Sequence, residues 1–151
     1  LCNTIENHIL EKEIDIVEYT RKVALNILNE LIIKYGQDLK NEQWVLEPFA
    51  DMIISFSVMN LGIIRYNQMS DDIKKNYSLA ILRCSLFRHL DIIVSKTKQL
   101  NNYIYDEIKS NEANKNLESE VQSFNWYVDT ISLEQSIYQA LEKYNGKYYL
   151  D

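Results

Sequence analysis

The side chains that could bind a metal ion or act as a nucleophile are few, since the 151-residue chain has two histidines and two cysteines. A di-iron helical bundle needs a Glu-x-x-His motif on each of two helices. Three residues before His8 stands Ile5, and three residues before His89 stands Leu86. Both motifs are absent, and the sequence predicts no di-iron site.

Other combinations of these residues give no stronger site. His8 lies one helical turn before Glu11, but the adjacent Lys12 opposes a cation there, so a solvated helix face is expected. Cys2 and Cys84 have no Cys or His at metal-ligand spacing, and we interpret them as reduced thiols of a cytoplasmic protein. No Gly-rich phosphate loop or nucleophile elbow is present. We therefore expect no catalytic residue and no metal ligand in this chain.

Composition limits both the fold and the partners. Three Gly and one Pro are too few for the frequent turns of a β-sandwich or barrel, and they favour long helices. The formal net charge of −6 argues against a nucleic-acid partner, because such binding depends on neutralising phosphates with Lys and Arg. No apolar run reaches the roughly 18–20 residues of a transmembrane helix, and we find no signal peptide. We expect one cytoplasmic domain covering residues 1–151.

Apolar residues recur at helical spacing in four segments of the chain. The expected helices are about 14–35, 38–69, 71–108 and 117–144. A polar stretch at 109–116, with no apolar residue larger than alanine, is the expected loop before the fourth helix. Four long helices with short links predict an all-α, up-down helical bundle, because side-chain ridges fit into grooves in near-antiparallel packing.

The second segment contains the clearest apolar stripe, and turn signals precede it. Gly36 is expected to end the first helix in a left-handed conformation, and Asp38 or Asn41 is expected to cap the second. Pro48 interrupts the second segment, so either one helix kinks near residues 44–48 or a regular helix begins at Pro48. We expect one kinked helix. The stripe consists of Phe49, Met52, Ile53, Phe56, Met59 and Ile63.

The residues around this joint are the candidate functional residues. The candidates for a structural joint or a partner contact are Tyr35, Gly36, Glu42, Gln43 and Asp51. One interpretation is a helix start with a solvated face. The other is a polar set that faces another surface, with Gln43 and Asp51 hydrogen-bonding across helices, because a partly buried carboxylate is costly without a partner.

The order of residues across the joint is more specific than any one of them. The matching positions are the Tyr35-Gly36 turn, Leu39, Glu42-Gln43, Leu46 and Ala50-Asp51-Met52. This series resembles the joint between two antiparallel helices in the helical domain appended to the C-terminus of very-long-chain-type acyl-CoA dehydrogenases. The resemblance covers roughly Tyr19 to Tyr66. The chain departs from it at Glu47-Pro48, where the family more usually has Arg, so no basic contact is implied there.

The resemblance implies that the intact protein is an FAD-dependent acyl-CoA dehydrogenase, an oxidoreductase that converts an acyl-CoA thioester to the trans-2-enoyl-CoA in fatty-acid β-oxidation. The catalytic Glu and the flavin and acyl-CoA sites would lie upstream, so no catalytic or cofactor-binding residue is transferred to this chain. The appended domain of that family packs against the catalytic core and contributes to dimer architecture. The implied partners are therefore the chain's own catalytic domain or a second subunit of a homo-oligomer. Membrane attachment is not expected, because an acidic chain lacks the Lys/Arg-rich face that anionic lipids attract.

Two other classes of function are open on the residues alone. One is a stand-alone helical bundle for dimerisation or partner binding. The other is a small-molecule-binding bundle that uses its aromatic and methionine side chains, among them 11 Tyr and 2 Trp. A ligand-binding bundle should have a substantial apolar cavity between its helices.

The first testable prediction concerns the cofactor. Because the chain has no flavin-binding or nucleophile motif, the purified 151-residue segment should contain no flavin and should not oxidise acyl-CoA with an added electron acceptor. An absorbance scan and an acceptor-reduction assay measure the two properties. A bound chromophore that absorbs near about 450 nm, as flavins do, would contradict the prediction.

Overall fold

The computed structural model describes residues 10–69 and 77–143, and every regular element in these two ranges is helical. The elements are α2 (Glu11–Tyr35), the short 3-10 helix η1 (Gly36–Asn41), α3 (Gln43–Gln68), α5 (Leu79–Ile104), α6 (Glu107–Ser123) and α7 (Thr130–Lys143). The expected all-α fold is confirmed. The expected helix start at residue 71 and helix end at residue 144 lie outside the described residues, as do Cys2 and His8.

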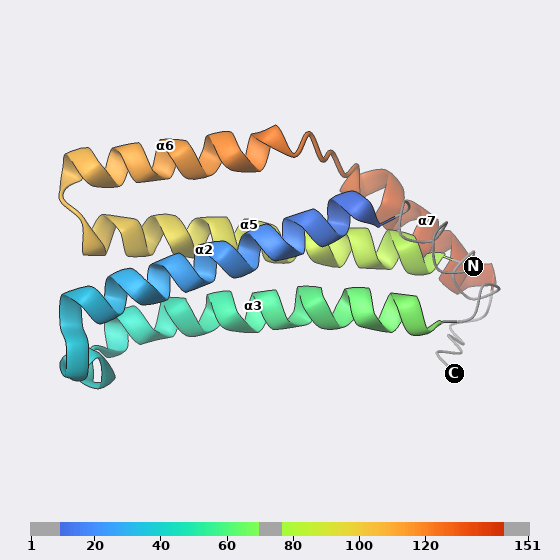
Figure 1. Ribbon diagram of the computed structural model, residues 1–151. Coiled ribbons are helices and arrows are strands. Elements are labelled where there is room, and N and C mark those ends of the chain that lie inside the picture. Colours follow the sequence, from blue (N-terminus) through green and yellow to red (C-terminus); the bar gives the residue numbers. More distant parts are fainter. Residues whose placement is uncertain (1–9, 70–76, 144–151) are drawn as a thin grey trace, which may run out of the picture.

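The helices α2, α3, α5 and α6 run side by side, and each reverses the direction of the one before it (Figure 1). The shorter α7 lies at the end of the bundle where α5 begins. The central helix is α5, which packs against α2, α3, α6 and α7. This up-down arrangement is the expected helical bundle, with α7 as an additional short element.

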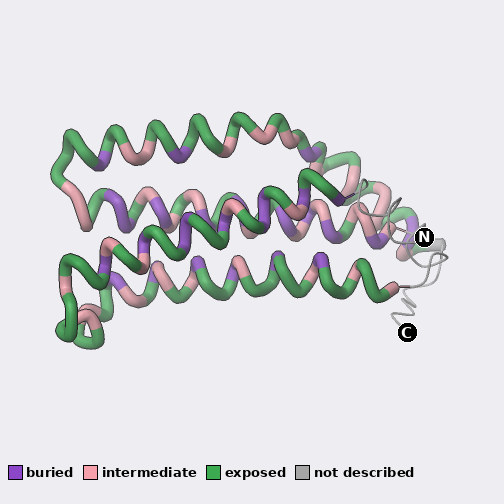
Figure 2. Tube along the Cα trace, viewed as in Figure 1, coloured by how far each residue is buried: buried purple, intermediate pink, exposed green. Residues whose placement is uncertain are grey.

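The core lies where α2, α3 and α5 face one another. Met52 and Met59 on α3, and Leu86 and Ile93 on α5, have at most 2% of their surface exposed. Each pair is seven residues apart, so its side chains lie on one face of their helix. Figure 2 shows the buried residues of α3 on the side toward its neighbours and exposed residues on the opposite side. Burial of each such side chain contributes about 1.5–3 kcal/mol relative to exposure.

At the corner between α2 and α3, the end of α2 agrees with expectation, but the start of α3 does not. Gly36 ends α2 with φ 53° and ψ −124°, and its N–H donates to the carbonyl of Ile32, so the expected positive φ is confirmed. The cap prediction is wrong, because η1 occupies the next residues and Glu42 precedes α3 without a side-chain cap hydrogen bond. Pro48 lies inside α3 and is buried. The second helix therefore begins at Gln43, neither at residue 38 nor at Pro48.

The predicted loop at 109–116 is wrong, because these residues form part of α6. The third predicted helix ends earlier than expected, at Ile104, and the chain turns at Tyr105 and Asp106. The side chain of Asp106 accepts a hydrogen bond from the backbone N–H of Lys109 at 2.9 Å. This N-terminal cap satisfies one of the free donors of the new helix.

Polar side chains join α6 to α5, which explains why a polar stretch forms a helix here. Asn101 Nδ2 donates to Asn114 Oδ1 at 3.0 Å, and Asn114 Nδ2 donates to Asn102 Oδ1 at 3.0 Å. Ser110, which is buried, also donates to Asn102 Oδ1. A polar residue is tolerated in a helix interface when its hydrogen bonds are made. We call these four residues the polar seam.

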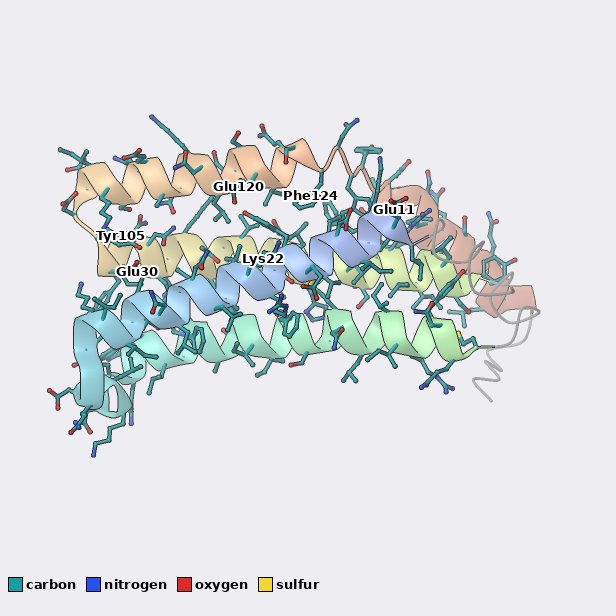
Figure 3. All side chains as sticks on the ribbon, in the orientation of Figure 1. Glu11, Lys22, Glu30, Tyr105, Glu120 and Phe124 are labelled. Atoms are coloured by element: carbon teal, nitrogen blue, oxygen red, sulfur yellow. The ribbon has the colours of Figure 1, made fainter. Side chains whose placement is uncertain are left out.

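The predicted fourth helix, 117–144, is interrupted at residues 124–129. Asn125 has a φ of 45°, and Asp129 accepts a hydrogen bond from the backbone N–H of Ser132 at 3.1 Å, which starts α7. At the break, the ring of Phe124 packs edge-on against Tyr19 of α2, with 5.2 Å between ring centroids. Tyr19 also donates to Glu120 at 2.9 Å. These contacts bridge α6 to α2, as Glu120 and Phe124 show in Figure 3.

One buried ion pair ties the start of α2 to α5. Glu13 has 1% of its surface exposed, and its Oε1 accepts a hydrogen bond from Arg83 Nε at 2.6 Å. The Arg83 side chain is 36% exposed, so water reaches part of the guanidinium. Removing one partner of such a pair leaves a buried charge without compensation.

The second prediction concerns this pair. Arg83→Met should destabilise the fold by about 3 kcal/mol, the lower part of the range for a broken buried pair, because Glu13 stays buried without its partner. The double variant Glu13→Leu/Arg83→Met should recover most of this loss, because the carboxylate is then also absent. Urea unfolding of the parent and both variants measures the difference. Equal stability of Arg83→Met and the parent chain would show that the pair is dispensable.

The third prediction concerns Gly36. A Cβ atom built at this residue meets no heavy atom within 4 Å, so substitution costs backbone strain alone. Gly36→Ala should lower the free energy of unfolding by about 1–3 kcal/mol, because this φ and ψ combination is nearly restricted to glycine. Gln37→Ala, at the exposed neighbour, should change it by no more than about 0.5 kcal/mol. If thermal and urea unfolding give the two variants equal stability, the strain argument fails.

Candidate docking surface

The five residues that the sequence singles out lie along the corner between α2 and α3. Tyr35 and Gly36 are the last residue of α2 and the first of η1. Glu42 and Gln43 are the residue before α3 and its first residue, and Gln43 is exposed. Asp51 lies two helical turns further along α3. These five residues are spread along the corner, and Asp51 lies further along α3 than the other four.

Asp51 makes the clearest contact between helices in this set. Its Oδ2 lies 2.8 Å from Lys96 Nζ on α5, and the two side chains are 42% and 30% exposed. A half-exposed pair of this kind contributes about 0–1 kcal/mol, because solvent screens the attraction. Asp51 thus helps to orient α3 on α5, and its partner lies within the bundle.

The end of α2 before the turn is joined to the C-terminal end of α5. Lys34 Nζ donates to the backbone carbonyls of Tyr103 and Ile104, at 2.8 Å each. A cation at the C-terminus of a helix is stabilised by the exposed carbonyls there. Burial, and then a hydrogen bond with Tyr103, raises the pKa of the Tyr35 phenol. The corner is therefore a structural joint between three helices.

The described residues contain no group of three or more His, Cys, Asp or Glu side chains that could hold a metal ion. Cys84 is buried, and burial together with the nearby Glu134 raises the pKa of its thiol. A thiol in that state is a poor nucleophile, because the thiolate is the reactive form. The buried cysteine is thus suited to packing.

A cavity of about 780 Å³ opens between α5 and α7. Its lining includes apolar side chains of both helices, and also His89 and the Arg88–Glu134 ion pair that joins them. The buried His89 Nδ1 has no hydrogen-bond partner. The volume is within the range of small-molecule pockets, so the cavity that a ligand-binding bundle requires is present.

A smaller and more polar hollow of about 300 Å³ lies between α2, α5 and α6. Glu30, Tyr105 and Glu120 line it, and Figure 3 labels all three. Burial, followed by the charge of Glu30, raises the pKa of the Tyr105 phenol. The hydrogen bond from Tyr19 to Glu120 also lies on this side of the bundle. The charged side chains that line this hollow are the carboxylates Glu30 and Glu120, so an anionic ligand is disfavoured there.

Several large apolar side chains of α3 are exposed. We use the name outer face of α3 for five apolar residues that remain exposed. They are Ile53 (40% exposed), Ile54 (60%), Val58 (38%), Leu61 (62%) and Ile64 (43%). No charged residue occurs between positions 52 and 64. Contiguous exposed apolar patches on soluble proteins mark sites of association.

This exposure follows from the position of α3 in the bundle. The helix is apolar around most of its circumference, but only α2, η1 and α5 make extensive contact with it. Only 28% of its most apolar stretch of 18 residues is buried. A helix that is hydrophobic all round is normally covered on all sides. The helices of the described ranges 10–69 and 77–143 therefore leave one side of α3 without the cover that its sequence favours.

Among the described residues, α3 is the one helix long and apolar enough to cross a membrane by length and composition. Its other side, however, carries Met52 and Met59 of the shared core. Insertion of α3 alone into lipid would remove these side chains from Leu86 and Ile93 of α5. The packing thus agrees with the expectation that no segment spans a membrane.

The outer face was not identified from the sequence stripe. That stripe included Ile53 but omitted Ile54, Val58 and Leu61, which recur at four and three residues and form a second series. The spacing shows that these residues share a side of the helix. It does not show that no other helix covers that side. No family model, curated protein or solved structure matches this chain, and the outer face of α3 is therefore interpreted from its own residues and contacts.

Proposed function

We propose that this chain is a non-catalytic helical docking domain of an FAD-dependent acyl-CoA dehydrogenase. It packs against the catalytic domain of that enzyme or against a second subunit. The observation that carries the docking function is the outer face of α3, an uncharged and exposed apolar surface. The chain itself holds no flavin and performs no oxidation; both belong to the upstream part of a cytoplasmic enzyme.

The energetics of the outer face favour association. Ile54 and Leu61 are 60% and 62% exposed, so covering them removes apolar area from water. Each contributes about 1 kcal/mol, because full burial of such a side chain is worth about 1.5–3 kcal/mol. Several adjacent residues are needed to offset the cost of association, and the five residues of the face supply them. Apolar residues at the centre of an interface, with polar residues around them, are the usual arrangement.

The acyl-CoA dehydrogenase assignment is supported by the corner between α2 and α3. The resemblance implies two antiparallel helices joined at a Tyr-Gly turn, followed by a Glu-Gln helix start. In this chain α2 and α3 are antiparallel (Figure 1), Gly36 has a positive φ, and Gln43 begins α3. The residues of the resemblance thus coincide with a structural joint, as a packing domain requires.

A stand-alone partner-binding bundle would use the same surface, whereas a small-molecule-binding bundle would use the cavity between α5 and α7. We favour docking over ligand binding because none of the described helices covers the outer face of α3. The cavity already contains an internal ion pair between Arg88 and Glu134.

The fourth prediction tests this proposal in the intact gene product. Its sequence upstream of Leu1 should encode a flavin-dependent dehydrogenase domain, and the purified protein should bind FAD and form trans-2-enoyl-CoA. Ile54→Glu and Leu61→Glu should each reduce the assembled fraction seen by size-exclusion chromatography several-fold, because a charge is costly in an apolar interface.

Ile108→Glu is the matched control for this experiment. Ile108 is 82% exposed on α6, so the same substitution there should leave assembly unchanged. Circular dichroism should give the parent helix content for all three variants, because each changed residue is exposed. An upstream region without a dehydrogenase domain would refute the assignment. Equal assembly of all variants would refute docking through α3.

A further inference from the structure

Four exposed residues of α3 have a spacing that is the same when it is counted from either end of the helix. Glu47, Ile54, Val58 and Arg65 follow one another at intervals of seven, four and seven residues. Arg65 follows Glu47 by 18 positions, which is about five helical turns, so both lie on one side of the helix, about 27 Å apart. The chain thus places two apolar residues between a negative and a positive end, and both charged residues are exposed.

This symmetry of spacing distinguishes two ways of pairing α3 with another α3. In a parallel pair, Glu47 faces a second Glu47 and Arg65 faces a second Arg65, so both ends repel. In an antiparallel pair with equal spacing, Glu47 of each copy faces Arg65 of the other. The same register places Ile54 opposite Val58 of the other copy, and the small Ala50 near the large Leu61. Charge and shape therefore favour the antiparallel pair.

We infer that the occupant of the outer face of α3 is a second copy of this chain, bound through an antiparallel α3–α3 contact with two-fold symmetry. The contact consists of Ile54, Val58 and Leu61, which are the residues of the outer face on the side of Glu47 and Arg65, and it is flanked by two equivalent Glu47–Arg65 ion pairs. This inference rests on the proposed docking function and selects the second subunit as the partner on this face.

Neighbouring charges do not oppose the arrangement. Asp51, the nearest carboxylate on the side of α3 toward α5, is neutralised by Lys96 at 2.8 Å. Arg65 takes part in an interaction within its own chain. Its guanidinium has five N–H donors, so it can also bind a carboxylate of the other copy. Residues 52–64 add no charge between the two ends.

The fifth prediction tests the inference by charge reversal in the isolated chain. The parent should sediment at equilibrium as a dimer with twice the 17.9 kDa chain mass. Glu47→Arg and Arg65→Glu should each raise the dimer dissociation constant about 10-fold or more, because each places two like-charged pairs in the contact. The double variant Glu47→Arg/Arg65→Glu should return close to the parent value, because both pairs are re-formed with reversed signs.

Glu112→Arg on the exposed side of α6 is the matched control and should leave the dissociation constant unchanged. Circular dichroism and urea unfolding of each variant separate a loss of folding from a loss of pairing. If the parent chain remains monomeric at concentrations up to about 100 µM, its association free energy is at most roughly −5.5 kcal/mol. This result would overturn the inference. Docking to the catalytic domain would then still be decided by the intact-protein experiment. If the double variant does not recover the parent dissociation constant, the antiparallel register is wrong. If the chain is monomeric and sediments with phosphatidylcholine–phosphatidylglycerol vesicles, lipid is the occupant of the outer face.

Discussion

The packing of α3 against α5 is the interaction on which the rest of the structure depends. Met52 and Met59 on one helix and Leu86 and Ile93 on the other lie in the buried core, and Leu31 of α2 belongs to the same core cluster. The seven-residue spacing on both helices keeps these side chains on facing sides over several turns. Because this contact uses one side of α3, the opposite side must find another cover or stay in water. The outer face of α3 is the direct consequence.

The bundle becomes more polar with distance from this contact. Buried methionine and aliphatic side chains hold α2, α3 and α5 together, whereas α6 adds only Leu117 to the buried core cluster and is also joined to α5 by the polar seam of Asn101, Asn102, Ser110 and Asn114. Hydrogen bonds between side chains have a modest net value, since water offers the same partners in the open state. We therefore expect α6 to contribute less to stability than α3. The helix with the exposed face, α3, is also the most apolar of the described helices.

The described residues offer a buried cysteine with a raised thiol pKa and ion pairs that neutralise their own charges. None of these supplies a reactive group at an accessible site. By contrast, an apolar surface bounded by one carboxylate and one guanidinium can contribute both to the affinity for a partner and to the orientation of that partner. In protein interfaces of this kind, apolar burial supplies most of the affinity, and charges at the edge favour one orientation of the partner.

Three features follow from the amino-acid sequence alone, namely the helical class, the turn at Gly36 and the core positions Met52 and Met59. These depend on local backbone preference and on periodicity within one segment. The sequence did not determine that residues 109–116 are helical, because their stability comes from hydrogen bonds to α5 and from the Asp106 cap. Nor did it determine which apolar side of α3 stays exposed. Periodicity places Leu61 and Met59 on different sides of the helix, but only the tertiary structure decides which side α5 covers, because burial is a property of two surfaces in contact.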